Sequence, residues 1–430
     1  MPSFLLWSTL SVANNWKRQT GLCQKKWTES YDTWTNKLAW RCLRQRWSRL
    51  HIVDSLKQQR QQANIEENKR LTHRLYILWK FIRPHTFIGT LVSISSLTIL
   101  ANEYVSRCLQ FIGSEGCEHT TPYQGTVLLF KYLCCWLFRS NTASTGLVDG
   151  ARKLSYSLAA NNIAPDQGWT PIFGFLTALV PALLINVYIV GLNQLFDIEV
   201  DRINKPFLPL ASKELSVRWA WVIVMLCGSL GLILGLVLPY TSVPLIGTLF
   251  ASMLLGSMYS MPPIRLKKYP FLASFCILVV RGVLVNIGFS QHARIVAGYG
   301  ASLSPCCWFY CIFFALFGIS IALMKDIPDV KGDRLFQLRS FSVILGPQVV
   351  FRWTVIFLTL VFMMSSYVLW FIVPILFCKW LLAGCHLIFG LLLWFKSVHV
   401  DAENSAQVYQ FYMFMWKLFY GVYILLPLAG

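Results

Sequence analysis

The chain has 430 residues, of which 56% are hydrophobic and only 13% are charged, and its formal net charge is +19. This apolar composition excludes an ordinary soluble globular domain of the same length. A nucleic-acid-binding protein would cluster its basic residues on a soluble fold, whereas here Lys and Arg separate apolar blocks, so we expect no nucleic-acid partner. We expect a polytopic protein of a lipid membrane, in which positive loops flank the spans.

The N-terminal 60 residues are basic and poor in acids. They contain eleven Lys or Arg against three acids and show no sustained apolar periodicity. Such a composition is typical of an organelle transit peptide, so we predict a transit peptide and a disordered lead over residues 1–70. Residues 71–105 then hold an amphipathic stretch, LYILWKFIRPHT, suited to the membrane surface, followed by the first spanning helix.

Nine segments are apolar and long enough to cross a bilayer, which takes roughly 20 residues. We therefore predict an all-α fold with spans at residues 86–105, 171–195, 219–238, 243–259, 271–290, 303–324, 352–374, 376–395 and 410–428. A further apolar patch at 126–138 is short and is interrupted by Lys131. It lies within residues 106–168, an atypical insertion that we expect to be poorly ordered. Residues 169–430 hold the other eight spans.

Basic residues concentrate in alternate loops of this predicted topology. With nine spans, the basic loops after the second, fourth and sixth spans lie on one face of the membrane, together with the basic N-terminus. This asymmetry follows the positive-inside rule. Any polar residues at the ends of the second and sixth spans therefore share a face.

An acidic cluster closes the second span. In NQLFDIEVD, Asn193, Asp197 and Asp201 recur every four residues. On a continuous helix, successive members are about 40° apart around the axis. All three side chains are therefore expected to point the same way.

A second acidic cluster, KDIPDVKGD, closes the sixth span. Asp326, Asp329 and Asp333 follow the spacing i, i+3, i+7, and Pro328 suits the first turn of a new helix. Carboxylates at membrane depth normally mark a site or an ion pathway. Two converging groups repel each other unless a cation lies between them, and Mg²⁺ prefers such oxygen ligands and joins them to phosphates. We predict a Mg²⁺ cofactor held by Asp197, Asp201, Asp329 and Asp333.

Basic residues suited to phosphate oxygens share this face. Arg265 and Lys267 follow the fourth span in YSMPPIRLKK, Arg83 precedes the first span, and Arg202 and Lys325 flank the acids. We predict that these five residues bind a diphosphate. Each could instead be an ordinary positive-inside anchor.

Three alternative interpretations remain open from the residues alone. The acids could pair with neighbouring Arg and Lys in solvated loops. Intramembrane acids also serve cation-coupled transporters, for which cation flux without diphosphate release would be diagnostic. A nonenzymatic lipid-binding or quinone-binding membrane protein would bind its ligand regardless of chelation by EDTA.

Several motifs resemble one known family. NQLFDIEVDRINKP, YSMPPIRLKK and KDIPDVKGDR are similar to the signatures of UbiA-superfamily intramembrane prenyltransferases. FIRPHT, RSFSVILG and FYMFMWKLFY resemble its plant homogentisate prenyltransferase branch, which acts on aromatic compounds. The resemblance covers roughly residues 70–110 and 169–430, and residues 106–168 depart from the family by their length.

The resemblance implies a fold, a location and a reaction. The fold is nine transmembrane helices around a central cavity open to lipid, in a plastid (chloroplast) membrane. The reaction is Mg²⁺-dependent transfer of an allylic prenyl group from a prenyl diphosphate to a ring carbon of a phenolic acceptor. Homogentisate, a coumarin or a flavonoid remain possible acceptors, and the donor length stays open between dimethylallyl and phytyl.

The resemblance also assigns residues by their place in the motifs. Asn193, Asp197 and Asp201 form the first motif, and Asp326, Asp329 and Asp333 form the second. The aromatic face of Tyr259 is a candidate for stabilising the allylic cation. Asn193 or Gln194 is a candidate for orienting the acceptor.

Overall fold

The structure is a computed structural model that describes Trp47, residues 60–101 and residues 170–429. Of the predicted transit peptide and disordered lead over residues 1–70, the structure describes only Trp47 and residues 60–70, and the latter are helical. The predicted insertion at 106–168 lies outside the described residues. The chain divides into two units, 1–75 and 76–430. In the first unit, residues 60–75 are helical and exposed. Among the described residues, all the long apolar helices lie in the second unit.

Within the described residues, nine helical segments are long and apolar enough to cross a membrane. They confirm the nine predicted spans, with ends shifted by a few residues. Eight are α3 (Pro84–Ala101), α7 (Thr170–Phe196), α9 (Val217–Val237), α10 (Val243–Ser260), α13 (Pro305–Lys325), α16 (Pro347–Ile372), α17 (Leu376–Ser397) and α18 (Ser405–Leu425), the last extended by η3 (Leu426–Ala429). The fifth span joins α11 (Pro270–Leu278), the π-helix η2 (Val279–Gly288) and α12 (Phe289–Val296).

Several of these helices begin with residue types that favour a helix start, namely Ser at the N-cap and Pro in the first turn. The hydroxyls of Ser216, Ser242 and Ser304 accept hydrogen bonds from backbone N–H groups in the first turns of α9, α10 and α13. Ser at this position satisfies a donor that the helix cannot. Proline occupies the first or second position of α10, α11, α13 and α16, where its missing N–H has no cost.

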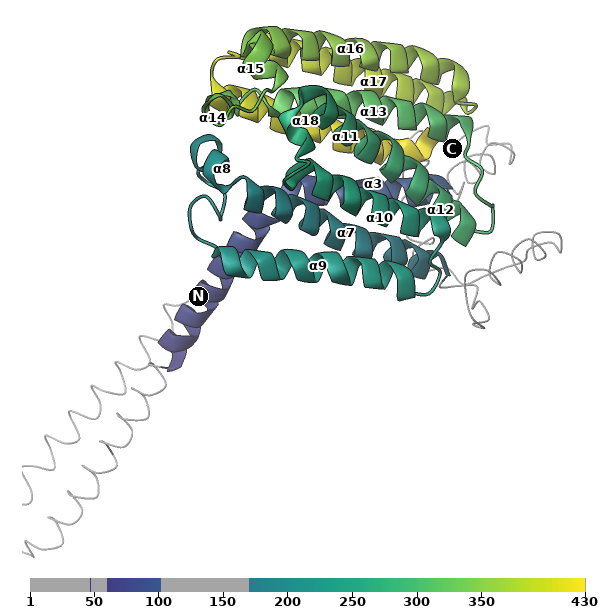
Figure 1. Cartoon of the computed structure of the whole chain (residues 1–430). Helices are drawn as coiled ribbons and strands as arrows, with labels where there is room; N and C mark the ends of the chain where they lie inside the picture. The colour runs from purple at the N-terminus through teal and green to yellow at the C-terminus, as the bar shows by residue number, and fades with distance from the viewer. Residues whose placement is uncertain (1–46, 48–59, 102–169, 430) are drawn as a thin grey trace, which may run out of the picture. The chain divides into compact units, whose positions relative to one another are not determined.

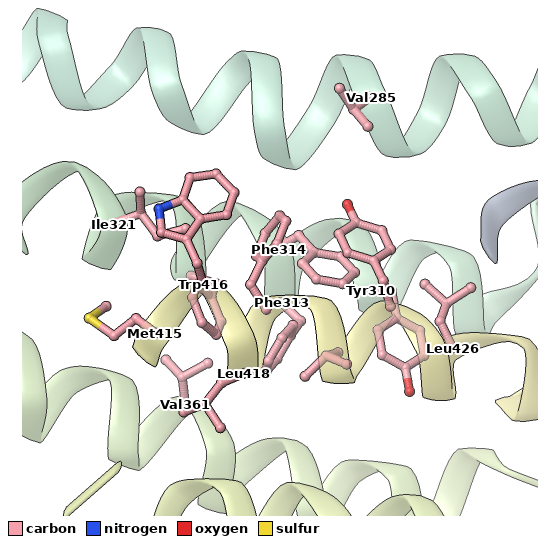
Figure 2. Close-up of a cluster of buried hydrophobic side chains, with 14 of the residues drawn as sticks. Val285, Tyr310, Phe313, Phe314, Ile321, Val361, Met415, Trp416, Leu418 and Leu426 are labelled. Atoms are coloured by element: carbon pink, nitrogen blue, oxygen red, sulfur yellow. The ribbon is translucent and has the colours of Figure 1, made fainter. Parts of the chain in front are cut away.

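The spans pack side by side in a bundle. α7 lies against α9 and α3, α16 lies against α17 and α13, and α18 lies against α3 (Figure 1). An aromatic core fills the space between α13, α16 and α18. Figure 2 shows Phe313 and Phe314 of α13 and Trp416 of α18 among the side chains of this core. Phe314 stacks on Tyr423 with ring centroids 3.7 Å apart. The core thus joins the sixth span to the last one.

Short helices gather at one end of the bundle. Figure 1 shows α8 (Ile198–Asn204), α14 (Val330–Leu335) and α15 (Phe341–Leu345) together there, and α8 packs against α14. The expectation of one continuous helix through Asn193, Asp197 and Asp201 was wrong. α7 ends at Phe196 and α8 begins at Ile198, so Asp197 lies at the break between them.

Candidate active site

A polar cavity of about 210 Å³ lies at the end of the bundle that carries the short helices. All six acidic-motif positions border it: Asn193, Asp197, Asp201, Asp326, Asp329 and Asp333. Five cationic side chains also border it: Lys80, Arg83, Lys205, Lys267 and Lys325. The two motifs, more than a hundred residues apart in the chain, therefore meet at one site.

Lys205 and Asn204 connect the two motifs directly. The Lys205 ammonium donates a hydrogen bond to Asp329 and lies 4.0 Å from an oxygen of Asp201. Burial by itself would lower the pKa of Lys205, but the carboxylates of Asp329 and Asp201 outweigh it and the pKa is raised. The Asn204 side-chain oxygen accepts a 2.8 Å hydrogen bond from the backbone N–H of Gly332. Because Gly332 has no side chain, α14 can approach α8 this closely.

Asp197 is held by three side chains from other parts of the site. Arg265 donates a 3.0 Å hydrogen bond to one carboxylate oxygen, and Lys267 donates to the other. Asn193 donates to that second oxygen at 3.1 Å. Asn193 and Lys267 also line the cavity, whereas Arg265 does not. Arg265 therefore holds the Asp197 carboxylate in position from the side away from the cavity.

Tyr259 and Lys325 form a second polar group at the cavity wall. The Lys325 ammonium donates a 2.8 Å hydrogen bond to the Tyr259 hydroxyl and lies 3.1 Å from an oxygen of Asp326. The Tyr259 ring centroid is 5.4 Å from the same ammonium. Together these two distances place the ammonium beyond the hydroxyl, at the edge of the Tyr259 ring and not over its face.

Arg83 joins the site from the start of the first span. Its guanidinium lies 3.7 Å from an oxygen of Asp201, and its backbone adopts a left-handed conformation, with φ of 50°. For a non-glycine residue this conformation is uncommon. It turns the chain sharply before α3 and leaves the Arg83 side chain at the cavity.

Three sequence-based assignments do not fit this geometry. Arg265, predicted to bind the diphosphate, contacts Asp197 and does not border the cavity. Arg202 is missing from the cavity wall, is 42% exposed, and pairs with Glu199 at 2.8 Å. It is therefore not placed to bind a diphosphate there. Gln194 is buried and donates a 2.6 Å hydrogen bond to the backbone oxygen of Phe81. It ties α7 to the segment before α3 and cannot orient an acceptor.

Three carboxyl groups of the cavity have a raised pKa. Burial raises the pKa of Asp201, although Lys205 and Arg83 oppose it. Burial also raises the pKa of Asp326. For Asp333, burial together with Asp329 and Asp326 raises the pKa to about 7. One oxygen of Asp329 is buried and accepts no hydrogen bond from the described residues. A divalent cation in the cavity would satisfy all of these groups.

The carboxylates of the cavity suit a Mg²⁺ ion that also binds water and substrate. They do not form a site that would hold a metal ion with protein ligands alone. Among the described residues, no three His, Cys, Asp or Glu side chains lie close enough to hold an ion by themselves. Mg²⁺ does not need such a cage, because it usually takes one or two carboxylates and completes its shell with water and substrate phosphates. The residues present therefore suit Mg²⁺ ions that reach their full coordination with a diphosphate.

A second cavity of about 240 Å³ adjoins the first. Its wall is mostly apolar and comes from α3, α7, α10, the fifth span and α18. Six residues border both cavities: Arg83, His85, Asn193, Tyr259, Lys325 and Tyr412. A molecule with a charged head and an apolar body can therefore occupy both spaces at once.

Several residues at these cavities were missed by the sequence reasoning, among them Lys205, His85, Arg281 and Tyr412. Lys205 follows the first motif directly, so its proximity to the acids was a usable signal. His85 and Tyr412 lie inside quoted motifs, FIRPHT and FYMFMWKLFY, without an assigned role. Arg281 stands alone in an apolar run, and nothing in its neighbours along the chain indicates a site.

The chain is similar to proteins of one known family. Residues 155–418 match the UbiA prenyltransferase family. The chain is 36% identical to homogentisate phytyltransferase of a Synechocystis strain, over 82% of this chain and 94% of that one. It is 34% identical to the chloroplastic homogentisate phytyltransferase 1 of Arabidopsis thaliana, over 84% and 77%. It is also 34% identical to the chloroplastic coumarin 8-geranyltransferase 1 of Citrus limon, over 70% and 73%.

Proposed function

This chain belongs to the UbiA prenyltransferase family, and we propose that its two adjoining cavities bind a prenyl diphosphate and a phenol for aromatic prenylation. The enzyme is an aromatic prenyltransferase and a multi-pass protein of the plastid membrane, as its relatives and its spans indicate. The observation that carries the proposal is the cavity in which both acidic motifs meet five cationic side chains, continuous with an apolar cavity.

The prenyl donor fits across the two cavities. Arg83, Lys205, Lys267 and Lys325 present cationic groups to the polar cavity, where they can bind the oxygens of a diphosphate. The apolar cavity then takes the isoprenoid tail, because removing its hydrocarbon surface from water or lipid headgroups is favourable. This placement puts the allylic carbon of the donor where the two cavities meet, next to the residues that border both of them.

Asp197, Asp201, Asp329 and Asp333 would hold Mg²⁺ ions against the diphosphate. When bound, the metal neutralises charge that develops on the leaving diphosphate oxygens. Lys205 and Lys267 already contact Asp329 and Asp197, so they can shift from these carboxylates toward the diphosphate when it enters.

The transfer itself is an electrophilic aromatic substitution. The allylic C–O bond breaks, and its electron pair leaves with the diphosphate. A ring carbon of the phenol then donates an electron pair to the allylic cation and forms the new C–C bond. The ring proton is released, the leaving diphosphate can accept it, and aromaticity returns. The ring of Tyr259, at the junction of the cavities, can stabilise the cation through its π face.

The proposal is tested by removing single carboxylates. Asp197→Ala and Asp329→Ala should each abolish prenyl transfer in membranes supplied with Mg²⁺, a panel of prenyl diphosphates and a panel of phenols, with products read by mass. Glu199→Ala is the matched control, because Glu199 lies between the two Asp of the first motif but is exposed and pairs with Arg202. EDTA should stop the wild-type reaction and excess Mg²⁺ should restore it. Normal turnover by both Asp variants would refute the metal assignment.

A further inference from the structure

His85 is the second residue of the first span, α3, and borders both cavities. It therefore lies where the donor and the acceptor are proposed to meet. Neither the binding of the diphosphate nor the stabilisation of the allylic cation gives it a role. Histidine is the side chain that enzymes most often use to move a proton.

Among the described residues that border both cavities, His85 alone can act as a base near neutral pH. These residues are Arg83, His85, Asn193, Tyr259, Lys325 and Tyr412. Arg and Lys side chains are already protonated, and the amide of Asn is not basic. The two tyrosine hydroxyls also keep their protons at neutral pH. A neutral imidazole differs, because one of its nitrogens carries no proton and can accept one.

The imidazole nitrogens of His85 have no hydrogen-bond partner in the part of the chain that the structure describes. Neither nitrogen is a fully buried atom, so both can be reached from the cavities. Two fully buried histidines differ in this respect. His292 contacts Ser242 and the backbone oxygen of Gly174, and His386 contacts a backbone oxygen of its own helix. Their rings serve internal hydrogen bonds, whereas that of His85 is left for a ligand.

Aromatic side chains of α18 hold His85 in place. The Tyr420 hydroxyl donates a 2.6 Å hydrogen bond to the backbone oxygen of His85. The ring centroid of His85 lies 5.2 Å from that of Trp416 and 6.0 Å from that of Tyr412, and the latter pair meets edge to face. These contacts restrict the plane of the imidazole. A general base needs such a fixed ring, because proton transfer requires hydrogen-bond contact with the proton's donor.

Among the described residues, the charged groups that act on His85 are all cations. They are Arg83 before α3, Lys205 after α8 and Arg281 of η2. The titratable side chains that contact it are Tyr412 and Tyr420 of α18. No described carboxylate pairs with the ring, so no anion holds a second proton on it. The same cations stabilise an oxyanion that forms beside the ring.

We propose that His85 is the general base that takes the hydroxyl proton of the acceptor phenol, so that the acceptor attacks the allylic carbon as a phenolate. The inference rests on the proposed prenyl transfer and adds a catalytic residue to it. A phenolate ring is a much stronger carbon nucleophile than a phenol ring, because the oxygen anion donates electron density to the ortho and para carbons.

Bonds and charges balance over the transfer. The phenol O–H bond breaks, its electron pair stays on the oxygen, and the proton moves to a ring nitrogen of His85. The phenolate forms the C–C bond to the allylic cation, and its oxygen becomes a carbonyl. The ring C–H bond then breaks, its proton leaves with the diphosphate, and its electron pair restores the aromatic ring. The oxygen finally takes the proton back from His85, which regenerates the base.

The pH dependence of the wild-type enzyme gives the first test. The probes are geranylgeranyl diphosphate and homogentisate, or the phenol of the panel that the wild type converts faster, in Mg²⁺-containing membranes under nitrogen. A phenol with a pKa of about 10 gains about tenfold more phenolate per pH unit between pH 7 and pH 9. Because His85 forms the phenolate within the site, the wild-type kcat should change less than about threefold over this range.

Two outcomes of this first test have separate meanings. A wild-type kcat that rises about tenfold per pH unit overturns the assignment of His85, because the enzyme would then depend on phenolate from solution. Absence of product with every donor and phenol tested would instead overturn the proposed prenyl transfer.

Substitution of His85 gives the second test. His85→Gln should lower kcat at pH 7 on the order of 100-fold, because general base catalysis contributes about 10²–10⁴-fold. The KM for geranylgeranyl diphosphate should stay near wild type. The remaining activity should rise about tenfold per pH unit up to pH 9, since only phenolate from solution can react. His399→Gln is the matched control, because His399 is exposed after α17 and borders neither cavity.

A purely structural role for His85 predicts a different pattern. In that case His85→Gln would lower kcat by the same factor at pH 7 and at pH 9, and the inference fails. If His85→Gln does not accumulate in membranes, the wild-type pH profile and the variant His85→Asn, read in the same way, decide the question.

Discussion

At the scale of single residues, two basic side chains near the end of α8 differ in their role. One borders the cavity, and the other forms an ordinary surface ion pair. Arg202 and Lys205 lie three residues apart on or just after α8. Arg202 is 42% exposed and pairs with Glu199 on its own helix, whereas Lys205 is 20% exposed and contacts Asp329 of the other motif. An exposed pair contributes roughly 0–1 kcal/mol. Of the two, Lys205 borders the cavity that we propose binds the diphosphate, and Arg202 does not.

We therefore expect opposite results from two neighbouring substitutions. Lys205→Gln should lower kcat/KM for the prenyl diphosphate on the order of 100-fold, because it removes one of the cations of the cavity and leaves Asp329 without its partner. Arg202→Gln should change it less than about threefold. Steady-state kinetics in membranes, at equal protein amounts, measure both. An equal loss in the two variants would argue against the cavity as the diphosphate site.

At the scale of elements, glycines decide how closely the helices that bear the site approach each other. Gly282 of η2 and Gly318 of α13 both lie where these helices pack. A Cβ atom at Gly282 would meet the Cα and backbone nitrogen of Ala315 at 2.4 and 2.8 Å, and a backbone cannot move aside as a side chain can. A Cβ atom at Gly318 would meet its neighbours at 3.7 Å or more, which is ordinary contact.

Gly282→Ala should consequently destabilise the protein by about 1–3 kcal/mol, because it forces η2 away from α13. Gly318→Ala should be neutral or stabilising by up to about 1 kcal/mol, since Ala favours the helix more than Gly does. Thermal unfolding of the two purified variants in the same detergent checks this comparison. A Gly282→Ala protein as stable as wild type would contradict the close packing of η2 on α13.

At the scale of the whole molecule, the bundle places the site at one membrane face. The loops after the second, fourth and sixth spans supply Asp201, Lys267 and Asp329 to one cavity. With each span reversing the direction of the chain, these loops share a face, and the loop between α12 and α13 lies on the opposite one. The N-terminal side of α3 shares the face of the site, because Arg83 reaches the same cavity.

Cysteine labelling tests this orientation. Arg339→Cys and Ala301→Cys introduce thiols at exposed positions in the loops after the sixth and fifth spans, in a background without other reactive cysteines. A membrane-impermeant maleimide added to sealed vesicles of one orientation should label only one of them, and detergent should expose the other. Labelling of both in intact vesicles would contradict the predicted topology.

The sequence by itself determined the number of spans, their approximate ends and the face on which the acidic motifs lie. These depend on local properties: the length of apolar runs, the Ser and Pro residues that start helices, and the distribution of Lys and Arg among loops. Each is a property of consecutive residues and needs no knowledge of what packs against them.

Only the tertiary structure decided which side chains share a cavity. Arg202 lies on α8 and pairs with Glu199 of the same helix, whereas Lys205 follows the end of α8 and contacts Asp329 of the second motif. Gln194 is turned toward Phe81, and Arg281 borders a cavity whose other walls come from distant spans. Such placements arise from contacts between segments far apart in the chain, and no local pattern of residues contains them.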